Sequence, residues 1–273
     1  MATTRSVATA HVKDRIISVS SVLTPKECQG MIDTCETKGY KPSPLSGGGH
    51  GRTGREGART SQFCVKDDQA WADAMWTRVA PFVPGDLHSI KSVPYMNLTD
   101  PTTQGDEYTA VGVNPHLRFY KYDPGQFILK HDDYRMSRYR YDPVTDTYYY
   151  QITFFTLLFY LNQEFEDGQT CFWTKYATVD SSGHCRFLRD PGETTFAPHD
   201  LEIVPRTGSM LIQDHMVQHE GKPPRKGVKY ILRTDVLHEK PVPKDRVTMK
   251  MKKGQIYSDW QRHYEPSCLH YTE

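Results

Sequence analysis

The run 152–161 constrains the fold of this 273-residue chain more than any other segment. It reads Ile-Thr-Phe-Phe-Thr-Leu-Leu-Phe-Tyr-Leu and contains no charged side chain. A strand with one face in water alternates apolar and polar residues, whereas a strand that is apolar on both faces is covered on both sides. The run therefore predicts a central strand that is buried between other elements.

Shorter strands are predicted around this run, from about residue 110 onward. Residues 117–122 alternate, a Pro-Gly pair turns the chain at 124–125, and the next apolar alternation covers 127–131. Many short strands separated by proline and glycine predict an all-β barrel or jelly roll. The further strands are expected at 169–173, 201–204, 208–213 and 228–236.

Two amphipathic helices are predicted ahead of the strands, at 24–38 and 67–80. In the first helix, Thr24 and Glu27 have the spacing of a capping box. Pro81 is expected to end the second helix. The residues expected to face the core are Cys28, Met31, Ile32, Cys35, Trp71, Ala74, Met75 and Val79.

The whole chain, 1–273, is expected to form one domain that is mainly β with N-terminal helices, an α+β arrangement. In this prediction the helical part, about 1–110, buttresses the core. The β core itself covers about 111–240, and 241–273 form a C-terminal extension.

Charge and composition narrow the classes of function. The chain has 34 Lys and Arg against 33 Asp and Glu, so nothing in its charge favours nucleic acid or an anionic membrane as a partner. No apolar run reaches the length of a membrane span, and residues 1–6 lack the apolar core of a secretory signal. The six cysteines form no C-x-x-C pair, which favours free thiols and a cytoplasmic location.

The triplet His131-Asp132-Asp133 is a candidate metal site. Residues i and i+2 of a strand point to the same face, so His131 and Asp133 can bind one ion. A second histidine would complete two imidazoles and one carboxylate, the ligand set of non-haem Fe(II) oxygenases. Taken alone, an H-x-D triplet is also common at the ends of surface strands.

Two histidines compete for the third ligand position, His215 and His219. Both closely follow the predicted strand 208–213. We favour His219, because Gly221 then turns the chain and Lys229 begins a new strand at a spacing that suits a cosubstrate site. His215 remains the alternative ligand.

The strand after this turn carries cations on one face, since Lys229, Ile231, Arg233 and Asp235 alternate with other residues. A 2-oxoglutarate dianion that chelates the iron leaves its second carboxylate in a poorly solvated barrel, where an unpaired charge is costly. Lys229 is the predicted partner of that carboxylate, with the Tyr160 hydroxyl as a neutral donor. Arg233 would make a second contact to the cosubstrate or bind an acidic group of the substrate. The alternative, in which Arg233 is the 2-oxoglutarate anchor, stays open.

A series of motifs follows in order between residues 117 and 236. The motifs are Arg118-Phe119-Tyr120-Lys121-Tyr122-Asp123-Pro124-Gly125-Gln126-Phe127, His131-x-Asp133, Phe159-Tyr160-Leu161-Asn162, Asp167-Gly168-Gln169-Thr170-x-Phe172, Pro205-x-Thr207-Gly208-Ser209, His219-Glu220-Gly221 and Gly227-Val228-Lys229-Tyr230. Together they resemble the prolyl 4-hydroxylase-like group of Fe(II)/2-oxoglutarate dioxygenases. The motifs are specific for this superfamily and much less specific for a substrate.

The resemblance implies a double-stranded β-helix, a jelly-roll and cupin-like fold, that holds Fe(II) through His131, Asp133 and His219. It implies decarboxylation of 2-oxoglutarate by O2 to succinate and CO2, coupled to oxidation of an unactivated C–H bond, usually hydroxylation. Ascorbate would be expected to reduce iron that is oxidised in uncoupled turnovers. The implied contacts of 2-oxoglutarate are Lys229, Tyr122 and Tyr160.

The chain departs from the family pattern in two respects. The family often has two glycines before its threonine, whereas Asp167-Gly168-Gln169 precedes Thr170 here. Long inserts cover about 134–150 and 174–200, where lids could form, and they put a collagen-type peptide groove in doubt. The first insert is rich in tyrosine and arginine and is predicted as either a substrate lid or a solvated surface hairpin.

The predicted function is hydroxylation of an aliphatic C–H bond in a small amino-acid-like or carboxylate-bearing substrate, because Arg233 and the inserts suit an enclosed anion. Arg55 and Arg59, beside a glycine-rich loop at 47–57, are further candidates for contacting a substrate carboxylate. One alternative is a prolyl 4-hydroxylase that acts on a peptidyl proline of a soluble protein. A second is a barrel that binds metal or ligand without catalysis.

Overall fold

The computed structural model describes residues 6–11, 15–43, 58–91, 107–175, 177–179, 185–187 and 198–243. Three predicted features lie wholly or mostly outside these residues. They are the glycine-rich loop 47–57 with Arg55, most of the insert 174–200, and the C-terminal extension beyond residue 243.

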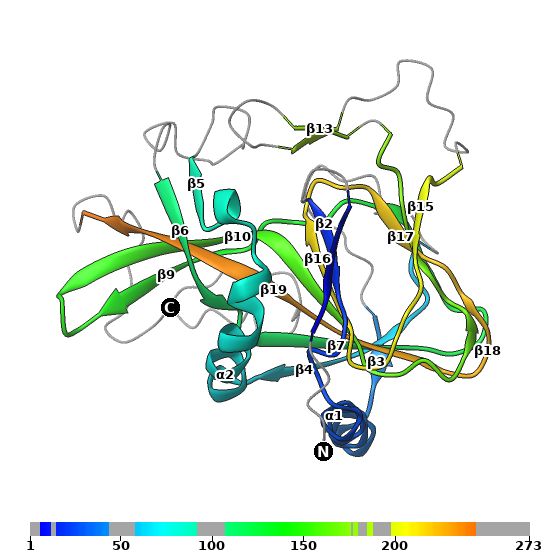
Figure 1. Cartoon of the computed structure of the whole chain (residues 1–273). Helices are drawn as coiled ribbons and strands as arrows, with labels where there is room; N and C mark the ends of the chain where they lie inside the picture. The colour runs from blue at the N-terminus through cyan, green and yellow to red at the C-terminus, as the bar shows by residue number, and fades with distance from the viewer. Residues whose placement is uncertain are drawn as a thin grey trace, which may run out of the picture.

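Two α-helices, α1 (Pro25–Lys38) and α2 (Gln69–Val79), precede most of the strands (Figure 1). Neither they nor the short 3-10 turns η2 (Ala80–Phe82) and η3 (Gly85–Leu87), the other helices of the described chain, are long and apolar enough to span a membrane. The strands are β1 (Ala8–His11), β2 (Ile16–Val19), β3 (Lys41–Pro42), β4 (Gln62–Asp67), β5 (Ser89–Lys91), β6 (Glu107–Val113), β7 (His116–Tyr122), β8 (Ile128–His131), β9 (Ser137–Asp142), β10 (Thr147–Tyr160), β11 (Glu166–Asp167), β12 (Thr170–Phe172), β13 (Ala177–Val179), β14 (Cys185–Phe187), β15 (Leu201–Ile203), β16 (Met210–Asp214), β17 (His219–Gly221), β18 (Pro224–Lys226) and β19 (Lys229–Val242).

Eight of these strands build two antiparallel sheets that form the barrel. The larger sheet contains the order β16-β10-β19-β7, and the smaller sheet has the order β15-β12-β17-β8. Along the chain, the strands pass back and forth between the two sheets. β7, β10, β16 and β19 belong to the larger sheet, and β8, β12, β15 and β17 belong to the smaller sheet. This alternation defines a double-stranded β-helix, so the predicted fold class is confirmed. In Figure 1, β15 and β17 lie on one side of the barrel, and the paired strands β10 and β19 lie on the other.

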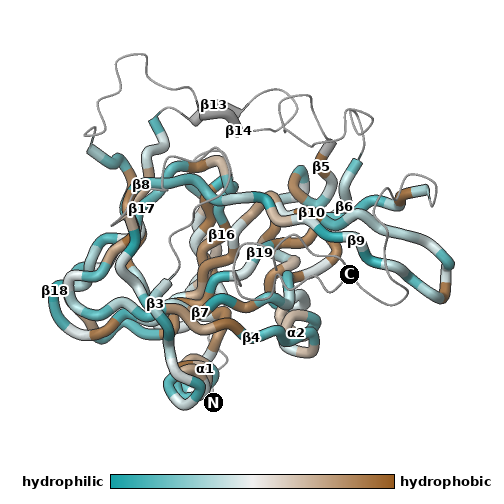
Figure 2. Tube along the Cα trace, turned by 180° about the vertical axis from the view of Figure 1, so that it is seen from behind, coloured by the Kyte–Doolittle hydropathy of each residue, from teal (hydrophilic) through white to brown (hydrophobic). Residues whose placement is uncertain are grey.

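Strand β10 lies at the centre of the larger sheet, between β16 and β19. Leu157 and Phe159 belong to one hydrophobic cluster, whereas Leu158 and Tyr160 belong to a second cluster inside the barrel. Every residue of 152–161 is buried, so the prediction of a strand covered on both faces is confirmed. Figure 2 shows hydrophobic segments gathered where β10, β16 and β19 meet.

The two helices pack on the outer face of the larger sheet, in the same hydrophobic cluster as the outward side chains of β10. Thr24 and Glu27 form the predicted capping box of α1, and Gly39 ends this helix with a φ of 87°. The prediction for Ala74 was wrong. It is exposed, and Ala72 faces the core instead. The buried residues of α2 are Ala72, Met75 and Val79, which have the spacing i, i+3 and i+7.

The insert 134–150 forms a hairpin from β9 and the first part of β10. Tyr148 pairs with Tyr141 across the hairpin, and Arg140 lies 3.1 Å from the carboxylate of Glu239 on β19. The insert therefore lengthens the larger sheet, which agrees with the surface-hairpin alternative of the two that the sequence left open.

Candidate metal centre and its pocket

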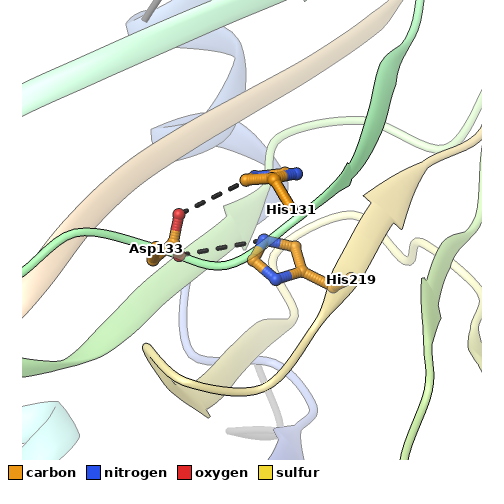
Figure 3. A group of neighbouring side chains, drawn as sticks. All are labelled: His131, Asp133 and His219. Atoms are coloured by element: carbon orange, nitrogen blue, oxygen red, sulfur yellow. Dashed lines mark ion pairs between the residues drawn. The ribbon is translucent and has the colours of Figure 1, made fainter. Parts of the chain in front are cut away.

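Three ligand-type side chains converge inside the barrel (Figure 3). His131 ends β8, Asp133 follows two residues later, and His219 begins β17, where it is the cross-strand partner of His131. Their ligand atoms all lie within 4.8 Å of one another. Each imidazole Nε2 is 3.8 Å from an oxygen of Asp133, a different oxygen in the two cases. Two imidazoles and a carboxylate thus face one point in space.

Backbone carbonyls fix the tautomers of both histidines. His131 Nδ1 lies 2.7 Å from the carbonyl of Leu129, and His219 Nδ1 lies 2.9 Å from the carbonyl of Val217. A carbonyl oxygen can only accept, so each Nδ1 carries the hydrogen and each Nε2 keeps its lone pair. A metal-binding imidazole needs this arrangement.

The Asp133 carboxylate is held on both oxygens. Thr156 Oγ1 donates to Oδ2 over 2.5 Å, and the amide of Gln213 approaches the same oxygen at 3.3 Å. Arg233 Nη2 lies 2.8 Å from Oδ1. The backbone N–H of Asp133 also donates to the carbonyl of His215. The carboxylate is therefore fixed in direction before any ion binds.

The protonation states of the three groups suit metal ligation. Burial lowers the pKa of His131 and of His219, so both imidazoles are neutral at pH 7. Burial alone would raise the pKa of Asp133, but the Arg233 guanidinium and the nearby histidines hold it well below its usual range. Neutral imidazole and ionised carboxylate are the forms that bind a cation.

His215, the alternative third ligand, faces a different partner. It is completely buried, and its Nε2 lies 3.4 Å from Asp235 Oδ1. Its backbone carbonyl accepts the N–H of Asp133. The structure therefore brings His219, and not His215, into the group with His131 and Asp133. His215 lies beside Asp235 instead.

A pocket of about 430 Å³, counting its open mouth, connects the three side chains with Lys229. Lys229 and Arg233 both line it from the same face of β19, and four residues span about 13 Å along a strand. Lys229 is only 2% exposed, and its Nζ donates to the carbonyl of Gly168 over 2.7 Å. No carboxylate of the described residues forms an ion pair with it. Burial lowers the pKa of Lys229 to about 8.

The two predicted pocket tyrosines differ in position. Tyr122 lines the pocket, with its ring centre 5.4 Å from Lys229 Nζ. Tyr160 lies behind Thr170, and its hydroxyl donates to Thr170 Oγ1 over 2.8 Å. Thr170, not Tyr160, is among the described residues that line the pocket. The Tyr160 hydroxyl therefore contacts the wall of the pocket through Thr170.

The backbone accommodates Asp167 in the segment before Thr170, where the sequence differs from the family pattern. Asp167 and Gly168 have φ values of 65° and 72°, in the left-handed region. Aspartate is among the few residues with a side chain that adopt this region readily. At Gly168 a Cβ would come within 2.8 Å of the Phe165 ring, so glycine is required there.

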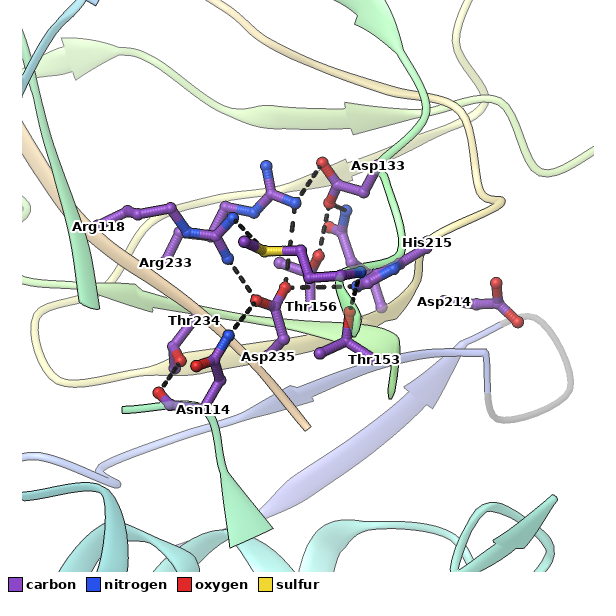
Figure 4. Close-up of polar contacts among 12 residues, drawn as sticks. Asn114, Arg118, Asp133, Thr153, Thr156, Asp214, His215, Arg233, Thr234 and Asp235 are labelled. Carbon is purple, nitrogen blue, oxygen red and sulfur yellow. Dashed lines mark hydrogen bonds and ion pairs between the residues drawn. The ribbon is translucent and has the colours of Figure 1, made fainter. Parts of the chain in front are cut away.

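A buried ionic network lies beneath the metal centre (Figure 4). Asp235 is completely buried and pairs with Arg118, and it lies 4.0 Å from the Arg233 guanidinium. Burial alone would raise the pKa of Asp235, but Arg118 and its other partners hold it below its usual range. Arg233 thus lies between two carboxylates, those of Asp133 and Asp235.

Sequence reasoning did not name Thr156, Thr170 or Gln213 as site residues. Thr156 and Gln213 are buried polar residues that interrupt apolar runs of β10 and β16, and that interruption is the signal that could have identified them. Arg59, one of the two arginines proposed for substrate binding, lines the pocket with its guanidinium 4.6 Å from the centre of the Tyr120 ring. None of the described pocket-lining residues comes from 134–150.

Comparison with known proteins finds similar structures but no match in sequence. No protein-family model matches the chain, and no curated protein matches its sequence significantly. The chain is structurally similar to prolyl 4-hydroxylases and to 2-oxoglutarate/Fe(II) oxygenases over about 82% of its length, at low sequence identity.

Three solved structures illustrate this similarity. A viral collagen prolyl hydroxylase from Paramecium Bursaria Chlorella virus-1 is 14% identical, with a TM-score of 0.41 and coverage of 82% of this chain and 96% of that one. A Pseudomonas putida prolyl-4-hydroxylase is 14% identical, with a TM-score of 0.44 and coverage of 81% and 92%. HygX from Streptomyces hygroscopicus, with nickel, 2-oxoglutarate and hygromycin B bound, is 12% identical, with a TM-score of 0.40 and coverage of 82% of each chain. At these identities an activity has to be argued from the residues of this chain.

Proposed function

We propose that this protein is an Fe(II)/2-oxoglutarate-dependent dioxygenase. One observation carries the proposal: His131, Asp133 and His219 converge in a pocket that also contains Lys229, a buried cation without a carboxylate partner among the described residues. The first three fit a ferrous ion with open positions. The lysine fits the distal carboxylate of a dianion bound to that ion, since a buried ammonium is stabilised by an anionic partner.

The side chains around the pocket have separate roles in this proposal. Fe(II), with 2-oxoglutarate and O2, would supply the oxidising chemistry that amino-acid side chains lack. The Nε2 atoms of the two histidines and the Asp133 carboxylate would hold the ion, and Lys229 would orient the cosubstrate. Leu158 and Ile231 line the same pocket and would help to exclude water from it.

A small substrate that carries a carboxylate suits the charge of the pocket. Arg59, Lys229 and Arg233 line it, and with Fe(II) their charge exceeds that of Asp133, Glu220 and a 2-oxoglutarate dianion. Arg233 uses Nη2 for Asp133, whereas its buried Nε has no hydrogen-bond partner among the described residues. That donor is available for a substrate carboxylate, which planar guanidinium groups recognise well. We propose hydroxylation of an aliphatic C–H bond as the outcome.

The test is succinate formation from 2-oxoglutarate in the presence of Fe(II), O2 and ascorbate. His131→Ala is expected to reduce it to background, because the ion loses one of its three protein ligands. His11→Ala is the matched control, since His11 lies in β1 and is not among the described residues that line the pocket. Equal turnover by the His131 variant and the parent protein would refute the proposal.

A substrate screen separates the alternatives that the sequence left open. Amino acids and other small carboxylates are expected to stimulate succinate formation. Stimulation by proline-containing peptides alone would instead favour a peptidyl-prolyl hydroxylase. Binding of metal and 2-oxoglutarate with no turnover across the screen would favour a barrel without catalysis.

A further inference from the structure

The smaller sheet carries polar side chains on the face turned away from the barrel. Phe172 and His219 pair across β12 and β17, and the His219 side chain points inward to the metal centre. Their neighbours Cys171 and Glu220 pair in the same register. Successive side chains of a strand point to opposite faces, so Cys171 and Glu220 lie on the outer face.

A histidine completes a group of three ligand-type atoms on this outer face. The Sγ of Cys171, a ring nitrogen of His199 and a carboxylate oxygen of Glu220 all lie within 4.8 Å of one another. Three different residue types from three separate segments thus converge, as they do at the barrel centre.

The backbone around His199 fixes its place. The carboxylate of Asp200 accepts from the backbone N–H of Thr174 and of Lys175, both over 2.7 Å. The backbone N–H of Asp200 donates to the carbonyl of Phe172. These bonds close the base of the long connection between β12 and β15 and hold His199 beside Cys171.

A second carboxylate lies next to the group. Glu202 of β15 is the other cross-strand partner of Cys171. Its carboxylate contacts His199 Nε2 and forms an ion pair of 2.6 Å with Lys222. A carboxylate paired with a histidine orients the ring at many metal sites.

The group is poorly compensated as it stands. Cys171 is completely buried, and no described residue hydrogen-bonds to its Sγ. Burial raises the pKa of the Cys171 thiol to about 12. Lys222 is occupied by Glu202. A divalent cation would stabilise both the thiolate and the carboxylate, with the thiol proton released to solvent.

We propose that Cys171, His199 and Glu220 bind a divalent ion of the zinc class on the outer face of the smaller sheet, with Glu202 as fourth ligand or ring-orienting partner. Sulfur, imidazole and carboxylate are the ligands that Zn²⁺ takes in tetrahedral sites, whereas Mg²⁺ and Ca²⁺ need oxygen alone. Solvent reaches the site, since the side chains of His199 and Glu202 are 24% and 39% exposed. The ion would tie the end of the β12–β15 connection to the strand that carries His219.

Cobalt titration tests this site separately from the barrel centre, since no cysteine or methionine is among the described residues that line the pocket. In a His131→Ala background, Co(II) is expected to give the near-ultraviolet absorption of a thiolate–cobalt bond. Cys171→Ser should abolish this absorption. Cys64→Ser is the matched control, because Cys64 is also a buried cysteine, on β4, and it should retain the absorption. Absence of the band in the background protein, or its survival in Cys171→Ser, would overturn the proposal.

Two further variants keep the test decisive if Cys171→Ser does not fold. His199→Ala and Glu220→Gln change side chains that are partly exposed. Each is expected to weaken zinc binding at least about tenfold in competition with a chelating dye. Unchanged affinity in both would mean an ordinary ion-paired surface built on Glu202 and Lys222. Both experiments measure metal binding, and His199 is not among the described residues that line the pocket, so loss of zinc binding in His199→Ala tests this site independently of succinate formation.

Discussion

The two ends of the pocket both bury a charge, but only at one end do the described residues provide a side chain of opposite charge. At the metal end, the Asp133 side chain is 1% exposed and has Arg233 at 2.8 Å and Thr156 at 2.5 Å. At the other end, Lys229 is 2% exposed, and among the described residues its only hydrogen bond goes to the carbonyl of Gly168. Asp133 is thus supported without any ligand, whereas Lys229 lacks the anion that would stabilise it.

This difference separates a preorganised end from a ligand-dependent end. A compensated carboxylate keeps its direction when the site is empty, which lowers the cost of binding an ion. A buried cation without an anion destabilises the folded chain and regains that free energy when a carboxylate arrives. Substitutions at the two ends are therefore expected to change stability in opposite directions.

The largest effect is expected from Arg233→Met. This change leaves the buried Asp133 carboxylate without its cation, which costs about 3–5 kcal/mol of unfolding free energy in the metal-free protein. Urea unfolding measures the change. Arg225→Met is the matched control, because its side chain is 66% exposed and its ion pairs contribute little. Loss of less than about 1 kcal/mol in the Arg233 variant would mean that the Asp133 end is not internally compensated.

Lys229→Met is expected to act in the opposite direction. The pKa of Lys229 is lowered from 10.5 to about 8, which corresponds to roughly 3 kcal/mol of burial cost at pH 7. After allowing for the hydrogen bond to Gly168, the variant should be more stable by about 2 kcal/mol. Its affinity for 2-oxoglutarate should fall about 100-fold, because the distal carboxylate loses its cation.

Calorimetric titration of the Mn(II)-loaded protein with 2-oxoglutarate measures that affinity. Lys226→Met serves as the control, since the Lys226 side chain is 71% exposed. A larger loss of 2-oxoglutarate affinity in Arg233→Met than in Lys229→Met would exchange the roles of the two cations. Such a result would favour the alternative in which Arg233 is the anchor.

The fold was predictable because its strongest signals are local. The run 152–161 identifies a strand buried on both faces, and alternation in 228–236 places Lys229 and Arg233 on one face of the next central strand. The start of α1 followed from the Thr24 capping box. Each of these features depends on residues that are near one another in the chain.

Partners across the barrel were not predictable from those patterns. Strand alternation puts Arg233 inside the barrel. Its contact with Asp133, which follows β8 of the smaller sheet, depends on how the two sheets pack. Arg118 and Asp235 form an ion pair although 117 residues separate them. The Tyr160 hydroxyl donates to Thr170 of the opposite sheet, a contact that the sequence pattern did not indicate. Such pairings follow from the spacing between sheets, which a single sequence does not encode locally.

The group of Cys171, His199 and Glu220 on the outer face of the smaller sheet was not predicted, for a different reason. The cysteines were interpreted as free thiols with no chemistry, because none lies in a C-x-x-C pair. Cys171, His199 and Glu220 come from three strands or strand ends, so no short motif contains them. Alternation from Phe172 and His219 would have placed Cys171 and Glu220 on a shared outer face, but not His199.

The pH dependence of 2-oxoglutarate binding sharpens the comparison further. Lys229 has a pKa of about 8 in the ligand-free protein, so its charge is lost as the pH rises above this value. Affinity for 2-oxoglutarate is then expected to fall about tenfold per pH unit. Lys229→Arg should remove this dependence, since a guanidinium stays charged. Equal slopes in the two proteins would mean that another group controls binding.

The same lowered pKa affects stability with a definite sign. Between pH 8 and 10.5 the unfolded chain binds a proton that the folded chain has lost, so the Lys229 contribution to unfolding free energy increases with pH. Lys229→Met should lose this increase, and its stability advantage should shrink above pH 8. Urea unfolding of both proteins at pH 7 and pH 9.5 tests the sign.

The smallest effect is expected from Thr156→Val, which removes one hydroxyl donor from Asp133 and keeps the shape of the side chain. Arg233 and Gln213 remain on the carboxylate, so metal affinity should fall only about tenfold. Thr153→Val is the matched control on the same strand: Thr153 is also completely buried, but its hydroxyl accepts from the backbone of Met136. Both variants should lose about 1 kcal/mol of unfolding free energy, because each removes one buried hydrogen bond. Only the Thr156 variant should bind Mn(II) more weakly. An equal loss of Mn(II) affinity in both variants would show that general destabilisation sets the affinity at this end of the pocket, and not the direction of the Asp133 carboxylate.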